Sequence, residues 1–434
     1  MNVPSAATSA SPGRLSGEHA KSLLVLLLCL AWLLPGLVGH DPWKPEEANT
    51  FGRVYHVLQT GDWVVPALGG EPSVEGPPLY HVVAAFFARL FSSLLPLHDG
   101  ARLASGLFTG LAVLLSALTA REFFGAGRGR VAAMLLVGSV GLLVRGHEML
   151  VDTALLAGFV LALYGLAVAP RRGAWGGVLL GTGVGVAFLS KGLLAPLEIL
   201  AIALLLPLHP RWRSRGYALA LGVALLAALP WLAVWPWALY QRAPRLLAEW
   251  WRHDLGRYLD LAALWHGTEE HGYFPKLLSW FAWPAWPIAL WTLWSGGRKG
   301  VKEPGVHFAL TVVLVLLAVL LAVADASDLN ALPLLPALAI LAAPGVDSLR
   351  RGAYAALDWF GVMTFGLFSG FLWLGWIAML TGWPAKLAER AHVLQPAYQA
   401  SFEGIPFAVA LTYTLTWLLL LSRLVIISLP LFTQ

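Results

Sequence analysis

Long apolar runs alternate with short polar segments along most of the chain. Runs close to the length that a bilayer requires are found at 22–38, 101–120, 131–147, 152–169, 174–190, 192–207, 217–237, 273–294, 305–324, 331–346, 357–380 and 404–429. A further run at 79–95 contains Arg89 and predicts a re-entrant or membrane-surface helix. The pattern therefore predicts an all-α, polytopic integral membrane protein with about 12 transmembrane helices.

The amino-acid composition also indicates an integral membrane protein. Of the 434 residues, 58% are hydrophobic and 12% are charged, which is too apolar for a water-soluble domain of this size. We expect a cytoplasmic N-terminal tail over 1–21, one transmembrane domain over 22–430 and no separate soluble domain. The single cysteine, Cys29, excludes an intramolecular disulfide and a zinc cluster of the cysteine type.

The placement of charge predicts the topology. With residues 1–21 in the cytoplasm, the short inside segments hold about half of the 29 basic residues, and most of the 24 acidic residues fall outside. Two long segments, 39–100 and 238–272, then lie on the outer side. The Leu and Trp spacing of 238–272 is typical of an amphipathic helix at the membrane interface. The net charge of +5 thus indicates membrane topology, and no nucleic-acid partner is expected.

Candidate chemistry is concentrated in the segment 39–100. Between His40 and Tyr80 its carboxylates are Asp41, Glu46, Glu47, Asp62, Glu71 and Glu75. A carboxylate is costly in hydrocarbon, so this segment must meet water or line a polar cavity. Glu46 and Glu47 follow Pro45. They fit either the acidic first turn of a helix or a catalytic pair in which Glu46 is the general base and Glu47 its neighbouring carboxylate. Asp152 begins an apolar run and fits either a helix N-cap or a site carboxylate.

These residues resemble a known family, the protein O-mannosyltransferases and lipid A aminoarabinose transferases, which are membrane glycosyltransferases of the GT-C class. The segment is similar to the family's first periplasmic loop, and the likeness covers roughly residues 22–345. The matching stretches are Trp43-x-Pro45-Glu46-Glu47, Gly61-Asp62-Trp63, Glu75-Gly76-Pro77-Pro78-Leu79-Tyr80, Glu148–Thr153, Leu189–Gly192 and Leu332–Leu338.

The resemblance implies transfer of a sugar from a polyprenyl-phosphate carrier to a lipid, glycan or protein acceptor, with inversion and without a metal. It places a multi-pass enzyme in the bacterial inner membrane among membrane lipids, with a periplasmic site formed by segments 39–100 and 238–272. Glu46 would take the proton of the acceptor hydroxyl, with Glu47 and Asp152 as the other catalytic residues.

The resemblance also suggests ligands for the carrier phosphate. Arg257 lies in a stretch similar to the family's His-x-x-x-Arg, and Lys191 and Tyr80 lie in matching motifs. Arg257 fits equally well an ion pair with Asp254 or Asp260. The chain departs from the family at four positions, with Glu46 where the family has Asp, Gly76 for Lys, Asn49 for Arg and Asn330 for Tyr.

No cofactor is expected to be required. Glu75, His253 and His271 are the candidates for a structural zinc site on the outer side, although their spacing has no tight ligand signature. Two other functions stay open. A transporter or flippase of lipid-linked sugars should show paired hydropathy repeats and polar residues at mid-membrane depth. A catalytically lapsed relative that only binds the lipid carrier is compatible with the missing cationic side chains.

Overall fold

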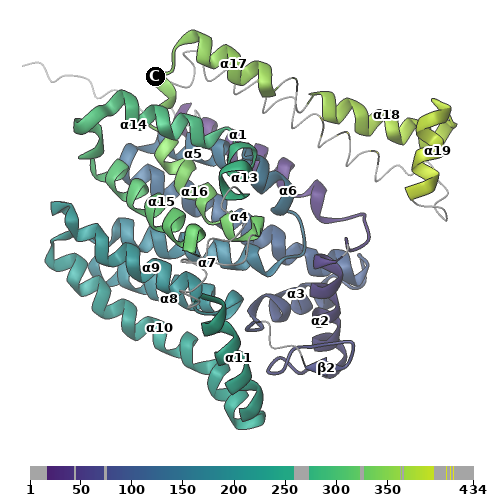
Figure 1. Ribbon diagram of the computed structural model, residues 1–434, viewed down its shortest axis with the longest axis horizontal. Coiled ribbons are helices and arrows are strands. Elements are labelled where there is room, and N and C mark those ends of the chain that lie inside the picture. The colour runs from purple at the N-terminus through teal and green to yellow at the C-terminus, as the bar shows by residue number, and fades with distance from the viewer. Residues whose placement is uncertain are drawn as a thin grey trace, which may run out of the picture.

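Helices make up most of the part of the chain that the computed structural model describes (Figure 1). The described residues are 17–394, apart from 44, 73–75, 259–272, 323–326, 362 and 364–365, together with 407, 411 and 414. Among them, the strands β1 (Ala67–Leu68) and β2 (Glu71–Pro72) form one antiparallel hairpin. The all-α prediction therefore holds except for this hairpin.

Five helices of the described part are long and apolar enough to cross a membrane. They are α4 (Leu97–Phe124), α7 (Val151–Val168), α8 (Gly173–Lys191), α10 (Arg215–Arg242) and α15 (Pro304–Ala322). Each coincides with a predicted run, because charged residues bound those runs on both sides. The prediction of a multi-pass membrane protein is confirmed to this extent.

Other predicted spans are shorter or divided. The shorter helices are α1 (Gly17–Leu33), α9 (Leu194–Leu205) and α16 (Leu334–Ala342). The run 131–147 is divided into α5 (Ala126–Val137) and α6 (Val140–Arg145), and the run 273–294 into α13 (Tyr273–Phe281) and α14 (Ala285–Val301). Pro284 has no amide hydrogen to continue a helix, which explains the second division. A count of about 12 spans is not established.

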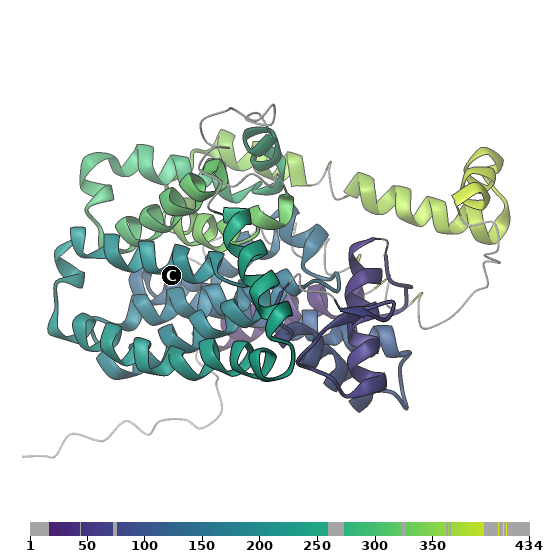
Figure 2. The same cartoon turned by 60° about the horizontal axis from the view of Figure 1, so that its bottom comes forward.

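Short 3-10 turns connect several of these helices. They are η1 (Pro35–Leu37), η2 (Leu206–Leu208), η3 (Pro210–Trp212), η4 (Asp328–Ala331) and η5 (Val346–Ser348). The helices α17 (Arg351–Gly361), α18 (Leu367–Thr381) and α19 (Ala385–Leu394) follow. Both views show α18 and α19 set apart from the bundle (Figures 1 and 2). The predicted run 357–380 overlaps α17 and α18, and residues 362, 364 and 365 between them lie outside the described part. The run 404–429 lies outside it except at three positions.

Glycines allow the central helices to approach closely. α8 lies between α7 and α10 and packs along both. A Cβ on Gly158 of α7 would lie 2.6 Å from the backbone nitrogen of Ala187 in α8, and one on Gly177 would lie 2.5 Å from the carbonyl oxygen of Ala220 in α10. Small residues at such positions let helix backbones pack tightly where no hydrophobic effect drives association. α7 is accordingly the most buried of the five long helices.

Acidic and basic segments gather at opposite ends of the bundle. At the basic end, Arg171 and Arg211 both pair with Glu122 at 2.9 and 3.5 Å, and His209 Nε2 lies 2.9 Å from the Lys302 carbonyl oxygen. These residues come from the segments predicted to lie inside. The other end, which we call the acidic end, carries α2 (Glu46–Thr60) and α3 (Leu79–Leu90), with the start of α7 and the end of α8. Which end faces the periplasm stays a prediction.

The two outer segments meet at the acidic end. α10 continues to Arg242, which donates to Asp62 Oδ1 at 2.9 Å, and Trp235 donates to the Val64 carbonyl oxygen at 2.9 Å. α11 (Pro244–Tyr258) follows and carries the buried Asp254, whose Oδ2 accepts from the Leu193 amide at 3.0 Å. Figure 2 shows α11 beside the α2–α3 group. These contacts fix the segment 39–100 over the ends of α7 and α8.

Candidate active site

The first turn of α2 separates the two acidic residues that the sequence placed side by side. Pro45 precedes the helix, and residues that are adjacent on a helix point about 100° apart. Glu46 is exposed and lines a cavity at the acidic end. Glu47 points into the protein and is 1% exposed. The two carboxylates therefore lie in different environments and do not act as a pair in one site.

Glu47 is held by three donors from three parts of the chain. Its Oε1 accepts from Arg102 Nε at 2.9 Å and from the Met149 amide at 2.7 Å. Its Oε2 accepts from the Trp43 amide at 2.8 Å. Arg102, on α4, also donates to Asp99 Oδ1 at 2.8 Å. We call these side chains, Glu47, Arg102 and Asp99, the buried ion network.

The network keeps Glu47 ionised. Burial raises the pKa of this carboxyl, but the hydrogen bonds from Arg102 and from the two amides outweigh burial and hold the pKa below its usual range. A buried carboxylate with a lowered pKa and donors on both oxygens is a poor proton acceptor. Glu47 does not line the cavity, so its expected catalytic role does not agree with its position. Its contacts instead join α2 to α4 and to the turn before α7.

The cavity at the acidic end has a volume of about 250 Å³. Its polar wall combines residues from segments far apart in the sequence. They are Glu46, Asn49, Thr50 and Arg53 of α2, His81 of α3, Asp152 of α7, Ser190 and Lys191 of α8, and Ser327 before η4. The structure thus brings together Glu46, Asp152 and Lys191, which the sequence placed in one site. No described residue of 238–258 lines this cavity, and 259–272 lies outside the described residues, so the expected contribution of segment 238–272 stays a prediction.

Asp152 and Lys191 form an ion pair in the cavity wall. Lys191 Nζ lies 2.6 Å from Asp152 Oδ1 and 3.4 Å from Asn330 Oδ1. Asp152 is buried at the start of α7, whereas the Lys191 side chain at the end of α8 is partly exposed. A carboxylate that is buried beside an ammonium group holds that group in one orientation. The pair presents a fixed positive group to the cavity.

Arg53 is a cavity residue that was not among the carrier ligands predicted from the sequence. It lies on α2 with Glu46, Asn49 and Thr50, at spacings of seven, four and three residues, which place all four on one helix face. That spacing was the signal that could have found it. Arg53 and Lys191 are the Arg and Lys side chains that line the cavity within the described part of the chain. They are the groups that could hold an anion there.

His81 is buried in the cavity wall and meets no hydrogen-bond partner among the described residues through either ring nitrogen. It lies on α3, a helix outside the long spanning segments. Burial, with a smaller effect from Arg53, lowers the pKa of His81 to about 3. A neutral imidazole can both donate and accept, so this ring is available to a polar ligand.

We expect His81→Leu to reduce acid sensitivity. The unfolded chain takes up a proton at His81 near pH 6.5, whereas the folded protein resists protonation down to about pH 3. The contribution to stability is therefore complete above about pH 6.5 and is lost as pH falls through that window. Melting temperatures measured between pH 7 and pH 4 should fall less steeply in His81→Leu. Parallel curves for the variant and the parent protein would contradict a buried neutral His81.

Tyr80 does not reach the cavity. Its side chain is fully buried, and its hydroxyl lies 2.6 Å from Ser105 Oγ of α4. Burial raises the pKa of Tyr80 above its usual range. The expected contact between Tyr80 and a carrier phosphate does not agree with this position, because the hydroxyl is already engaged between two helices. The role of Tyr80 in the structure is to pack α3 against α4.

Most of the residues predicted to bind zinc, and Arg257, lie wholly or partly outside the described part of the chain. Glu75 and His271 lie outside the described residues, and Arg257 lies on α11 with a side chain outside the described part. His253 is exposed on the same helix. Among the described residues, no group of three His, Cys, Asp or Glu side chains is close enough to hold a metal ion. The zinc prediction from Glu75, His253 and His271 is therefore not tested.

A second ion cluster fixes the far wall of the cavity. Arg145, at the end of α6, donates to Asp328 Oδ2 and to Glu148 Oε2, both at 2.8 Å. Asp328 begins η4, beside the cavity residues Ser327 and Leu329. The cluster thus holds η4 against the turn that precedes α7. Arg145 ends α6 and Glu148 lies three residues later, in the bend that follows this helix. Their partner Asp328 is distant in the sequence, so no local pattern identifies it.

Comparison with known proteins supports the resemblance. Residues 75–235 match the family described as dolichyl-phosphate-mannose-protein mannosyltransferase. A protein of Pseudomonas aeruginosa (strain UCBPP-PA14) named undecaprenyl phosphate-alpha-4-amino-4-deoxy-L-arabinose arabinosyl transferase is 35% identical over 230 residues, which cover 50% of this chain and 40% of the relative. A Pseudomonas fluorescens (strain Pf0-1) protein of that name, numbered 1, is 32% identical over 245 residues, 53% of this chain and 40% of the relative. The chain thus spans less than half the length of these relatives.

Solved structures show the same fold. The crystal structure of ArnT from Cupriavidus metallidurans bound to undecaprenyl phosphate matches with a TM-score of 0.68 at 20% identity, covering 93% of this chain and 76% of that one. The apo structure of the same protein gives 0.67 at 20% identity, covering 94% and 76%. The predicted GT-C architecture is therefore confirmed at the level of the fold. Asp152, Lys191 and Gly76 lie inside the matched family segment, whereas Glu46 and Arg53 precede it.

Proposed function

We propose that this chain, which is similar over half of its length to lipid A aminoarabinose transferases, transfers a sugar from a polyprenyl-phosphate carrier to a lipid, glycan or protein acceptor. The proposal places it in the bacterial inner membrane with the acidic end facing the periplasm. The carrier is proposed by analogy with the curated relatives, which are named for undecaprenyl-phosphate-linked aminoarabinose. Sugar and acceptor are left open.

One observation carries the proposal. A single cavity presents an exposed carboxylate, Glu46, together with Lys191 and Arg53. A transfer from a sugar phosphate requires these two kinds of group, namely a base for the attacking hydroxyl and cations for the departing phosphate. The cavity lies at one end of the long helices, where a carrier anchored in the membrane can reach it with its phosphate.

The proposed reaction is a single displacement. Glu46 takes the proton of the acceptor hydroxyl while that oxygen forms a bond to the anomeric carbon of the donor. The bond between this carbon and the phosphate oxygen breaks, and the phosphate leaves with the electron pair. Attack from the face opposite the leaving group inverts the anomeric carbon. The developing charge on the phosphate is stabilised by Lys191 and Arg53, and a charged donor makes the stronger hydrogen bond here.

Asp152 acts in this proposal through Lys191. Its 2.6 Å contact holds the ammonium group in place and leaves the Asp152 carboxylate buried. Positioned charges stabilise a transition state because they need no reorganisation during the reaction. Asp152 is the second candidate for the base, since it also lines the cavity.

The arrangement favours an enzyme over a transporter. The polar side chains of the cavity come from helix ends and from the segment 39–100, at one end of the bundle. A transporter binds its substrate near the middle of the membrane, at broken helices related by a repeat. The long helices α4, α7 and α8 that carry cavity or network residues run unbroken through the bundle.

We expect Gly76→Lys to increase affinity for undecaprenyl phosphate roughly tenfold, which corresponds to one charge-assisted hydrogen bond. Gly76 lines the cavity at the position where the family has Lys. A Cβ there would lie 3.7 Å from the Ser190 carbonyl oxygen, an ordinary contact, so the side chain has room. Binding can be measured by microscale thermophoresis in detergent.

Gly256→Lys is the matched control for this variant. Gly256 is exposed on α11, has open space where its Cβ would be and does not line the cavity. Its substitution adds the same charge to an outer segment and should leave the affinity unchanged. An equal gain in both variants would reflect general attraction of an anionic lipid, and would remove Gly76 from the carrier site.

The proposed activity is tested with the purified protein in nanodiscs and a panel of undecaprenyl-phosphate-linked sugars. Mass spectrometry should show release of undecaprenyl phosphate from one donor in the presence of a bacterial lipid extract as the source of acceptor. If no donor is consumed while undecaprenyl phosphate still binds in the cavity, the chain is a carrier-binding protein without transferase activity.

A further inference from the structure

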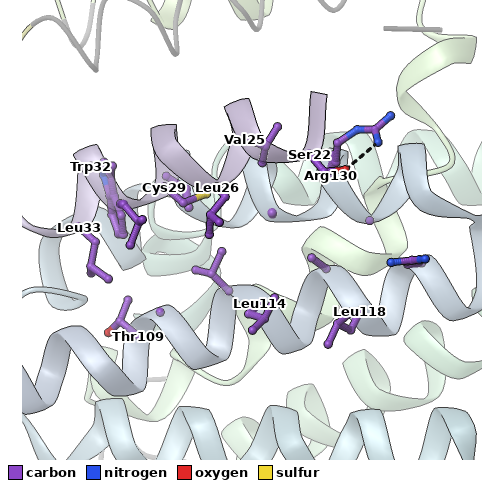
Figure 3. Close-up of a pocket in the computed structure, with 18 of the residues that line it drawn as sticks. Ser22, Val25, Leu26, Cys29, Trp32, Leu33, Thr109, Leu114, Leu118 and Arg130 are labelled. Atoms are coloured by element: carbon purple, nitrogen blue, oxygen red, sulfur yellow. Dashed lines mark hydrogen bonds between the residues drawn. The ribbon is translucent and has the colours of Figure 1, made fainter. Parts of the chain in front are cut away.

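A second cavity opens between α1 and the pair α4–α5, remote from the proposed active site (Figure 3). We call it the α1 groove. Its volume is about 230 Å³ and its wall is mostly apolar. Its lining comes from α1, from α4 between Thr109 and Arg121, and from α5.

Small residues create the groove. Gly110 and Ala117 on α4 and Ala133 on α5 face α1 with little or no side chain. Leucines of α1 and α4, including Leu26 and Leu114, form its sides (Figure 3). Along α4 the groove extends from Thr109 to Arg121, twelve residues and therefore about 18 Å at 1.5 Å per residue. One leaflet contributes about half of a hydrocarbon core of about 30 Å, so the groove matches one leaflet in length.

The groove is charged at one end only. Arg121 and Arg130 line this end, and Arg130 Nη1 donates to Ser22 Oγ at 3.3 Å. Arg121 is exposed and makes no ion pair with any residue that the structure describes. The nearby Arg128 is already paired with Asp347, and the lining residues that the structure describes include no carboxylate. This end belongs to the basic end of the bundle, which the charge pattern predicts to be cytoplasmic.

From this complementarity of charge and shape we propose that the α1 groove binds an anionic phospholipid of the leaflet at the basic end. One acyl chain occupies the apolar part, and the phosphate lies between Arg121 and Arg130. Arginine suits a phosphate because its planar guanidinium group can donate two parallel hydrogen bonds to it. Basic pockets between transmembrane helices on the cytoplasmic side are known to hold anionic lipid head groups. The site does not depend on the proposed transferase activity.

Such a lipid would join α1 to α4 and α5. α1 presents Leu23, Leu27 and Leu30 to the surroundings and contacts the bundle along one side only. A chain in the groove would cover apolar surface on all three helices at once. The carrier polyprenyl phosphate is the rival ligand, but its phosphate is proposed to bind at the acidic end, the opposite end of α4.

The charged end is tested by native mass spectrometry of delipidated protein with added phosphatidylglycerol, and with phosphatidylcholine of the same acyl chains. Arg121→Gln/Arg130→Gln should weaken retention of phosphatidylglycerol roughly tenfold or more, because two charge-assisted contacts are lost. Arg298→Gln/Lys299→Gln is the matched control. These exposed residues also belong to the basic end but lie outside the groove, so their loss should change retention less than twofold.

The apolar part is tested on the unaltered protein through Cys29, the single cysteine of the chain, which lines the groove. Phosphatidylglycerol should slow alkylation of Cys29 by N-ethylmaleimide at least fivefold, and phosphatidylcholine should not. Equal loss of retention in both double variants, or no protection of Cys29, would overturn the proposal. Stronger protection by undecaprenyl phosphate would assign the groove to the carrier, and a dimer that dissociates in Arg121→Gln/Arg130→Gln would assign it to a second copy of the chain.

Discussion

Arg102→Gln is expected to lower the free energy of unfolding by roughly 3–5 kcal/mol, the cost of breaking a buried ion pair from one side. Arg102 is 0% exposed and bonds to the carboxylates of both Glu47 and Asp99. Glutamine retains a hydrogen-bonding group but leaves two buried carboxylates without a cation. Because Glu47 joins α2 to α4 and to the Met149 amide, the segment that carries Glu46 should loosen. The loss is measured by thermal and denaturant unfolding in detergent.

Arg171→Gln is the control for this change. The Arg171 side chain is 65% exposed and its ion pair with Glu122 lies near the surface. Surface pairs contribute about 0–1 kcal/mol, so this variant should remain close to the parent protein. A double-mutant cycle of Arg102→Gln with Glu47→Gln should show strong coupling, since each substitution removes the partner of the other. Equal, small losses in Arg102→Gln and Arg171→Gln would contradict the buried ion network.

Glu46→Gln is expected to reduce sugar transfer by roughly 10²–10⁴-fold, the range that general-base catalysis contributes. The substitution preserves size and hydrogen bonding but removes the basic group. Glu46 is exposed at the start of α2 and takes no part in the buried ion network, so folding and affinity for undecaprenyl phosphate should be preserved. Single-turnover release of undecaprenyl phosphate from the donor separates this loss from a loss of binding.

Glu71→Gln provides the matched control, and Glu46→Asp gives the sharper test. Glu71 belongs to the same segment and is exposed on β2, but it does not line the cavity, so its variant should keep full activity. Glu46→Asp shortens the side chain to the Asp that the family has at this position. If the cavity is adapted to Glu, activity should fall through misplacement. Unchanged transfer in Glu46→Gln would remove Glu46 from the mechanism and assign the base to Asp152.

The sequence predicted those helices whose ends are marked by charge. α7 and α8 begin and end within a residue or two of the predicted runs, because the polar residues Asp152, Arg171 and Lys191 mark their ends. The divisions within 131–147 and 273–294 are not visible in hydropathy, since apolar residues continue across them. The structure shows that the two breaks contact each other, as the Val140 amide donates to the Trp283 carbonyl oxygen at 3.1 Å. A contact between residues so distant in sequence has no local pattern.

The same limit applies to the site. Motif positions were sufficient to bring Glu46, Asp152 and Lys191 to one cavity, because each stands at the end of its helix that lies at the acidic end of the bundle. Glu46 lines the cavity and Glu47 belongs to the buried ion network, and this difference was not predictable from the residues next to them in the sequence. They depend on Arg102, which lies 55 positions from Glu47 within an apolar run and is identified as its partner only by packing. His81 likewise follows the motif Tyr by one residue and became a site residue through burial beside the cavity.

The measurement that tests the central claim most directly is a cryo-electron microscopy map of the full chain in nanodiscs with undecaprenyl phosphate. The account predicts phosphate density in the cavity at the acidic end, within about 4 Å of Lys191 Nζ and beside Arg53, with the isoprenoid chain leading into the membrane. Phosphate density at Arg121 and Arg130 of the α1 groove, with the cavity at Glu46 and Asp152 empty, would contradict it.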